Sequence, residues 1–351
     1  MSRYLDLLGC FEEQLAGVAQ EPTASPHARP PFDLTVFDRI ALGYSGGKDS
    51  LAALLHVIEL GYPKDRIVLH HHDVDGNGAS SLFDYPVTRD YVRKVADHLG
   101  VRVLFSWREG GLEKEALREN CGVQPVTFTR LDGTSVTMGG ERSKANTRLK
   151  FPQVTSDLRL RYCSSVAKID VFARLLVNDP AYSDGKTLVI TGERAEESAN
   201  RARYASFEPH RCDNRNGRVP RWIDHWRNVL HWREQDVWAI IKRHRITPHV
   251  AYFLGMSRAS CFRCVFLGPD GWATNRAMDP DGFEKMAQYE ERFGVTIHRT
   301  RSLREQADRG KNLATDPYWV KQAMSKEFTA PIVMDPWVLP KGAYGANEGP
   351  T

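Results

Sequence analysis

The stretch that decides the fold is residues 39–61, RIALGYSGGKDSLAALLHVIELG. It begins with a short apolar run, continues with glycine and serine, and ends with leucine and isoleucine at helical spacing. This order predicts a strand over residues 39–43, a loop over residues 45–50, and a helix that ends before Gly61. Such a loop can bind phosphate, because several backbone N–H groups and the helix N-terminus point at one place.

The side chains of this loop suit a phosphate group. The lysine brings a positive charge, and the serine hydroxyls can donate hydrogen bonds to phosphate oxygens. The aspartate would be repelled by phosphate unless a cation intervenes, so we expect it to bind Mg²⁺. The Walker A motif is excluded, because it needs glycine in place of Leu42 and serine or threonine in place of Asp49. The residues expected to bind phosphate here are Ser45, Gly46, Gly47, Lys48, Asp49 and Ser50.

Further apolar runs alternate with helical patterns along the chain. Strands are predicted over residues 66–72, 101–107 and 186–191, with a helical pattern between the first two of these. The alternation is typical of the α/β class, so we expect a Rossmann-like parallel sheet with helices on both faces. Ligands of such sheets bind at the carboxyl ends of the strands.

Composition divides the chain into three parts. Residues 1–36 are an N-terminal segment with a linker, residues 37–265 are the expected catalytic domain, and residues 266–351 are a helical region with an extended or disordered tail. Residues 120–150 interrupt the alternation and are interpreted as an inserted hairpin or loop. Neither a membrane span nor a signal peptide is evident, so we expect no membrane partner and a cytoplasmic protein.

The loop supports a first comparison with a known family. Residues 43–54 resemble the PP-loop of the adenine nucleotide alpha hydrolase-like superfamily. The resemblance implies that the loop binds the β and γ phosphates, and that ATP is split into AMP and pyrophosphate. It also implies that Asp73, at the end of the second strand, lies near the adenosine. His70 to His72 precede it, and a tri-histidine metal site is disfavoured because neighbours on a strand point to opposite faces.

The fourth predicted strand leads into GERAEES, residues 192–198. Gly192 permits close approach to a ligand, and Arg194 and Arg201 can offer forked donors to phosphate oxygens or to charge at the α phosphorus. A surface helix start with Glu–Arg pairs is the alternative. The pattern resembles the phosphoadenosine phosphosulfate (PAPS) reductase-like branch of the superfamily.

The cysteines extend this resemblance. Cys261 and Cys264 form a C-x-x-C pair, which alone fits a redox dithiol, part of a zinc or iron–sulfur site, or chance. With Cys163, they stand where many relatives place ligands of a [4Fe–4S] cluster. Either Cys212 completes the set or one iron stays open, and zinc or plain buried thiols are the alternatives.

Two departures from the reductases favour ATP chemistry. No cysteine follows Cys264, whereas the reductases carry a reactive cysteine near their C-terminus. Their phosphate loop is usually degenerate, whereas this one is complete. A sulfonucleotide has no β and γ phosphates to fill a complete loop, so ATP is the expected cofactor.

Residues 194–233 contain nine arginines interleaved with aromatic residues. Arginine with aromatics can grip a phosphate backbone and stack on bases, which favours a nucleic-acid partner. The alternative is a solvated loop whose arginines pair with nearby acids.

These features together suggest sulfur transfer. The chain resembles the ATP pyrophosphatases of bacterial DNA phosphorothioation systems (Dnd or Ssp type), which implies a cysteine desulfurase and DNA as partners and allows a homo-oligomer. In that hypothesis Lys48 holds pyrophosphate, Asp49 positions Mg²⁺, Arg194 and Arg201 act at the α phosphorus, and the cysteine site relays sulfur. The alternatives are a PAPS reductase-like enzyme, a tRNA thiolation enzyme and a non-catalytic nucleotide-binding partner.

Overall fold

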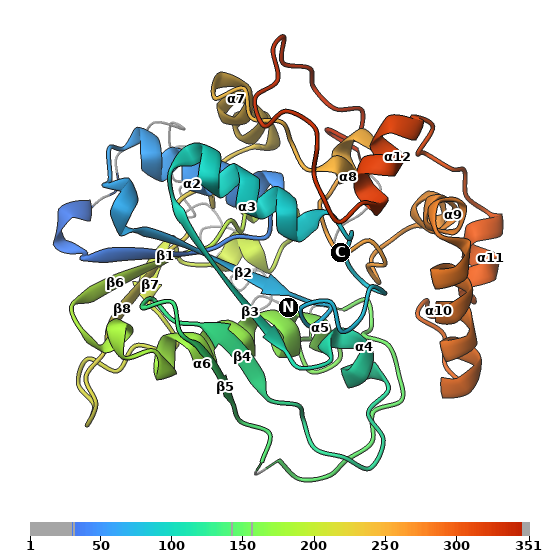
Figure 1. Cartoon of the computed structure of the whole chain (residues 1–351), viewed down its shortest axis with the longest axis horizontal. Helices are drawn as coiled ribbons and strands as arrows, with labels where there is room; N and C mark the ends of the chain where they lie inside the picture. The colour runs from blue at the N-terminus through green and yellow to red at the C-terminus, as the bar shows by residue number, and fades with distance from the viewer. Residues whose placement is uncertain (1–29, 31, 142, 156, 346–351) are drawn as a thin grey trace, which may run out of the picture.

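A central sheet of eight strands organises the molecule (Figure 1). The computed structural model describes residues 30, 32–141, 143–155 and 157–345. The strand order is β5-β4-β3-β2-β1-β6-β8-β7, in which β3, β2, β1, β6 and β8 run parallel and the other three are antiparallel to their neighbours. The strands are β1 Arg39–Gly43, β2 Ile67–Asp73, β3 Arg102–Arg108, β4 Val126–Thr129, β5 Ser135–Met138, β6 Lys186–Ile190, β7 Phe207–Pro209 and β8 Trp222–Trp226.

Helices cover both faces of the sheet, so the predicted α/β, Rossmann-like fold is confirmed. Figure 1 shows α2 and α3 on one face and α6 on the other, with α9 to α12 at one side of the molecule. The helices are α2 Lys48–Glu59, α3 Thr88–Leu99, α4 Gly111–Ala116, α5 Tyr162–Ser164, α6 Asp170–Asn178, α7 Glu234–Arg243, α8 Val250–Phe253, α9 Pro269–Met278, α10 Pro280–Phe293, α11 Leu303–Asp308 and α12 Pro317–Met324.

The alternation of side chains along β1 builds two cores. Ile40 and Leu42 belong to the large apolar cluster that includes residues of α2 and α3. Ala41, between them, belongs to a smaller cluster with residues of α6. All three side chains are fully buried, because a central parallel strand has helices on both faces.

The predicted elements agree closely with the observed ones. The first strand matches β1 residue for residue. The predicted second and third strands are shifted by one residue at both ends relative to β2 and β3, and the fourth is one residue longer than β6. The segment over residues 120–150 contains the antiparallel hairpin β4–β5, which extends the sheet beyond β3. The helical C-terminal region is present, and most of the predicted N-terminal segment lies outside the described residues. Within the described part of the chain, no helix is long and apolar enough to cross a membrane.

Candidate nucleotide site

The loop between β1 and α2 is shaped by its own serines. Gly47 caps the N-terminus of α2, and Gly46 has a left-handed backbone with φ of 82°, which favours glycine. Ser45 Oγ accepts a hydrogen bond from Gly47 N at 3.3 Å, and Ser50 Oγ donates to Gly47 O at 3.0 Å. The backbone N–H of Lys48 donates to the Tyr252 hydroxyl at 2.9 Å. These bonds hold the loop in a tight turn at the start of the helix.

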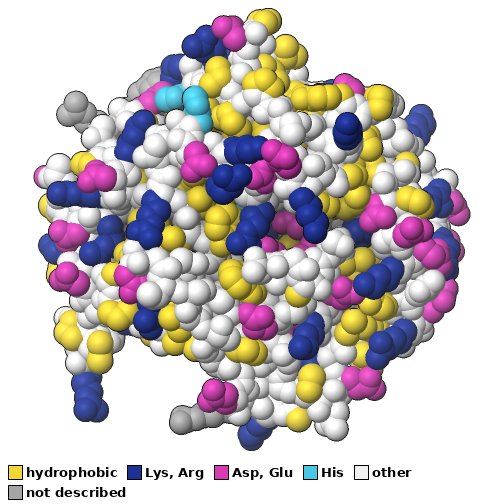
Figure 2. Space-filling view, viewed as in Figure 1, with side chains coloured by type: hydrophobic (Ala, Val, Ile, Leu, Met, Phe, Trp, Pro, Cys, Tyr) yellow, Lys and Arg dark blue, Asp and Glu magenta, His cyan; other side chains and the backbone are white. Residues whose placement is uncertain are grey.

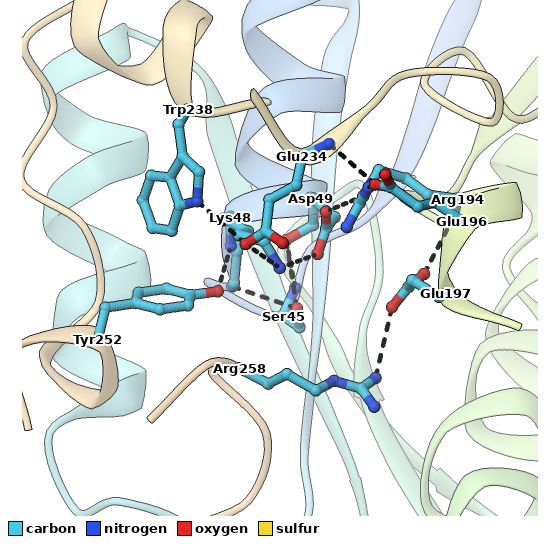
Figure 3. A network of polar contacts seen from close by, with 12 residues as sticks. Ser45, Lys48, Asp49, Arg194, Glu196, Glu197, Glu234, Trp238, Tyr252 and Arg258 are labelled. Carbon is cyan, nitrogen blue, oxygen red and sulfur yellow. Dashed lines mark hydrogen bonds and ion pairs between the residues drawn. The ribbon is translucent and has the colours of Figure 1, made fainter. Parts of the chain in front are cut away.

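Asp49 lies between two cations (Figure 3). Its Oδ2 is 3.2 Å from Lys48 Nζ, and its Oδ1 accepts from Arg194 Nε at 2.6 Å. Burial acts to raise the pKa of Asp49, but the two positive charges outweigh it and hold the pKa below its usual range. Lys48 and Arg194 therefore provide positive charge beside Asp49. Binding of Mg²⁺ to Asp49 stays a prediction.

Gly192 follows β6 and lies against the loop. A Cβ at this position would be 2.7 Å from both Asp49 C and Ser50 N, which is closer than side chains pack against backbone. Gly192 therefore packs against the backbone of the loop, and its contact with a nucleotide stays a prediction. A side chain there would push the loop away from β6.

The two predicted catalytic arginines both pair with nearby acids. Arg194 is buried and contacts Glu196 as well as Asp49, and Arg201 pairs with Glu197. Glu197 also lies 3.5 Å from Arg258 Nη2. Arg194 contacts Asp49 of the loop directly (Figure 3), whereas the partner of Arg201 is Glu197, outside the loop. The Glu–Arg pairing that was the alternative interpretation is present, on short 3₁₀ turns instead of a surface α-helix.

A pocket of about 250 Å³ opens beside the loop. It lies at the carboxyl ends of β1, β2 and β6. The strands β2 and β6 flank β1 on opposite sides, so the order of the strands reverses at this point. Sheets of the α/β class commonly bind their ligands at such a position. Phe172 contributes an aromatic wall, and Ala259 to Cys261 contribute another side. Its remaining lining residues are Gly43, Tyr44, Ser45, His70, His71, His72, Val74, Asp84, Thr88, Lys168, Ile169, Thr191, Glu193 and His249.

The three histidines of β2 divide between the faces of the sheet, as their alternation predicts. His70 and His72 have their ring centroids 5.3 and 5.1 Å from that of Phe172, whereas His71 packs against Phe105. Burial lowers the pKa of His70 to about 3, so this ring is neutral at pH 7. His70 Nδ1 and His72 Nε2 are buried without a hydrogen-bond partner in the described structure, and they could bond to a bound molecule.

Asp73 lies outside this pocket. It lines an adjacent cavity that shares His71 and Asp84 with the first one. Asp73 Oδ2 is 3.1 Å from Arg89 Nη1, and the guanidinium of Arg89 lies over the ring of Phe105 at 4.2 Å. Sequence reasoning did not single out Asp84, although its place shortly after the second strand was an available signal.

Comparison with known proteins agrees with this geometry. The sequence profile of the phosphoadenosine phosphosulfate reductase domain matches residues 39–266, which is most of the chain and includes the loop, the pocket and the C-x-x-C pair. The chain belongs to this family. The PAPS reductase-like region is therefore an adenine nucleotide-binding domain.

Individual similar proteins say less about function than the family does. An uncharacterized 37.8 kDa protein of Escherichia phage 186 is 26% identical over 278 residues, covering 74% of this chain and 76% of the phage protein. Candida glabrata FMN adenylyltransferase with ATP has a TM-score of 0.34 and 14% identity over 63% of this chain and 51% of that one. The complex of the same enzyme with FMN and the ATP analogue AMPCPP has a TM-score of 0.34 and 13% identity, over 65% of this chain and 56% of that one. The chain spans little more than half of the length of these structures, and the structural similarity is weak.

The cysteine site of this PAPS reductase family member brings three of the four predicted residues together. Cys163 and Cys261 each lie near Cys264, and Lys168 lies near all three. Burial raises the pKa of the Cys163 and Cys261 thiols, and the proximity of Cys261 is the main cause that raises the pKa of Lys168. Cys212 does not join them, because it is buried in the smaller core with residues of α6.

These residues do not fit a metal cluster as they stand. In the described ranges, no three His, Cys, Asp or Glu side chains are grouped so that they could hold a metal ion. A [4Fe–4S] cluster is most often held by four thiolates, and among the described residues only three cysteines lie near one another, so Cys212 does not complete the set. We therefore derive no chemical step through a cluster or a zinc ion.

The arginine-rich stretch is split between the two ends of the sheet. Trp222 pairs with Lys186 at the amino ends of β8 and β6, opposite the loop, and its ring lies 4.2 Å from the guanidinium of Arg215. Figure 2 shows basic and acidic side chains mixed over the visible face. A nucleic-acid partner therefore stays a prediction. The arginines of the stretch that form ion pairs are Arg194, Arg201, Arg215, Arg227 and Arg233.

Proposed function

We propose that the chain is an enzyme that splits ATP into AMP and pyrophosphate. The observation that carries this proposal is the complete loop of residues 45–50. The loop has a buried lysine at the N-terminus of α2, and the pocket described above opens beside it. A helix N-terminus and a lysine favour the β and γ phosphates. The pocket at the strand ends would then take the nucleoside, which leaves the α phosphorus between them.

Each named residue has a role in this proposal. The loop amides and Lys48 hold the departing pyrophosphate, and Arg194 stabilises negative charge near the α phosphorus. Asp49 is the candidate ligand for Mg²⁺, since each of its oxygens accepts one bond and keeps a lone pair free. Mg²⁺ would neutralise charge on the leaving pyrophosphate. His70 and His72 offer unused ring nitrogens to the nucleoside.

The proposal extends to sulfur transfer. An acceptor oxygen attacks the α phosphorus and pyrophosphate leaves, after which the sulfur of a hydrosulfide displaces AMP from the activated acceptor. If a persulfide displaces AMP instead, a second thiol must then cleave the S–S bond, which leaves the sulfur on the acceptor and joins the two thiols as a disulfide. Membership of the PAPS reductase family and the Cys261 thiol at the pocket edge support this extension. We propose DNA as the acceptor and a cysteine desulfurase as the sulfur donor, on the resemblance to the phosphorothioation enzymes.

The central test is the turnover of ATP. Purified protein with ATP and Mg²⁺, with and without DNA or tRNA, should release AMP and pyrophosphate in equal amounts. Lys48→Ala and Asp49→Ala should each lower the rate at least a hundredfold, whereas Lys64→Ala, at an exposed lysine outside the site, should not. Pyrophosphate release that persists in both loop variants contradicts the proposal, and so does sulfite made from PAPS without pyrophosphate.

The cofactor and the acceptor have their own tests. Anaerobic purification with a visible spectrum and an iron and zinc count decides whether the three cysteines hold a cluster, and a colourless, iron-free protein excludes it. Sulfur analysis of DNA and tRNA from a deletion strain identifies the acceptor, because only the modified nucleic acid loses its sulfur.

A further inference from the structure

Glu234 carries a carboxylate to the loop lysine from a distant part of the chain. It is the first residue of α7, and its Oε1 lies 3.8 Å from Lys48 Nζ (Figure 3). The Lys48 side chain is 5% exposed and the Glu234 side chain 24%, so the ion pair is partly shielded from bulk water. The reductase-like motifs of the sequence gave Glu234 no role.

The direction of this carboxylate is fixed from two sides. Glu234 Oε1 accepts a hydrogen bond from Trp238 Nε1 at 3.1 Å, one helical turn further along α7. The same oxygen accepts from the backbone N–H of Tyr344 at 3.4 Å, near the end of the described chain. Because the Trp238 ring is buried, the acceptor oxygen has little freedom to turn away from the loop.

The arrangement leaves Lys48 with free donors. A lysine ammonium has three N–H groups, and one of them bonds to Asp49 at 3.2 Å. The distance of 3.8 Å to Glu234 is an ion-pair distance and too long for a hydrogen bond, so it uses none of them. Two carboxylates from separate elements therefore hold the ammonium in place while two N–H groups remain for phosphate oxygens.

We propose that Glu234, oriented by Trp238, is a positioning residue that holds the Lys48 ammonium ready for the phosphates of ATP. This inference rests on the proposed binding of ATP at the loop. Holding the side chain before ATP arrives reduces the rotamer entropy lost on binding. Glu234 need not touch ATP itself.

The test compares three variants of the full-length protein by calorimetric titration with ATP and by steady-state release of pyrophosphate. Glu234→Gln removes the charge but keeps an oxygen for Trp238, so we expect the Kd and KM for ATP to rise about tenfold with kcat changed less than threefold. Trp238→Phe removes the donor together with part of a buried ring, and should raise both the Kd and the KM about threefold. The double variant should be no worse than Glu234→Gln alone, because both changes act through one carboxylate.

The comparison of KM with kcat separates positioning from a general structural effect. The charged or titratable groups around the Lys48 ammonium are Asp49, Glu234, Tyr252 and Arg194. Loss of a positioning charge should raise the KM for ATP and leave kcat nearly unchanged, whereas a general structural loss should lower kcat as well.

Asp236→Asn is the matched control, because Asp236 is an acid of the same helical turn that bonds to Arg233. It should stay within twofold of the wild type. Wild-type affinity for ATP in Glu234→Gln overturns the inference, and so does a double variant whose losses multiply. Release of pyrophosphate by the wild-type protein would in either case leave the proposed function standing.

Discussion

Gly192 is the residue on which the packing of the nucleotide loop depends most directly. Its Cα faces the peptide between Asp49 and Ser50, and the space holds no further carbon atom. Glycine is required here because of its size, since its φ does not lie in the left-handed region. The loop conformation and the end of β6 are therefore set together.

Gly192→Ala should displace the loop from β6. We expect ATP binding to weaken at least tenfold and stability to fall by about 1–3 kcal/mol, as in other overpacked sites. Titration with ATP and thermal melts measure the two effects. Gly43→Ala is the control for stability, because a Cβ there would meet Thr191 Cγ2 at an ordinary 3.7 Å. Equal melting temperatures of the two variants would contradict the steric explanation.

Asp84 gives the pocket a pH-dependent contribution to stability. Burial raises its pKa to about 7, with a further contribution from the charge of Asp75. An unfolded aspartate has a pKa of about 4, so the folded state keeps a proton that the unfolded state loses. This contribution is complete below about pH 4 and is lost as the pH rises through about 7.

Asp84→Asn cannot lose this proton. The variant should match the wild type near pH 4 and exceed it by about 1–3 kcal/mol near pH 8, because burial no longer penalises a charge. Denaturant unfolding at both pH values gives the comparison. A stability difference that does not change with pH would show that the ionisation of Asp84 is unimportant.

At the scale of elements, local patterns in the sequence predict strands and the loop well. Apolar runs bounded by turn residues located β1, β2, β3 and β6, since burial on both faces leaves a continuous apolar signal. The strands β7 and β8 were missed, because they are short and lie within the arginine-rich stretch, which resembled a binding loop. Cys212 precedes β8, so its burial in the α6 core could not be foreseen without that strand pair.

The hairpin β4–β5 was predicted as an insertion without a role, and the structure makes it part of the smaller core. Phe128 in β4 is fully buried with Leu175 and Leu176 of α6. Phe128→Ala should therefore cost about 3–5 kcal/mol of stability. Ser135→Ala, on the exposed side of β5, should cost less than about 0.5 kcal/mol in the same denaturant experiment. A loss of stability in Phe128→Ala as small as that in Ser135→Ala would mean that the hairpin does not contribute to this core.

At the scale of the whole molecule, the site depends on contacts between residues far apart in sequence. Lys48 meets Glu234, and Gly192 meets the loop, although sequence spacing cannot reveal either pair. The same holds for the C-terminal region. Trp272, Phe283 and Met286 belong to the apolar cluster that contains residues of β1 and α2.

A chain truncated after residue 266, where the family match ends, should not fold on its own. Its Arg263 side chain, fully buried, would lose Asp279 as its partner, and an unpaired buried charge costs several kcal/mol. The apolar surface under α9 and α10 would face water at the same time. We expect an insoluble protein without a cooperative melt, whereas removal of residues 346–351 should leave the melting temperature unchanged within a few degrees. A truncated chain that melts cooperatively and binds ATP like the full-length protein would instead show that the C-terminal region is a separate domain.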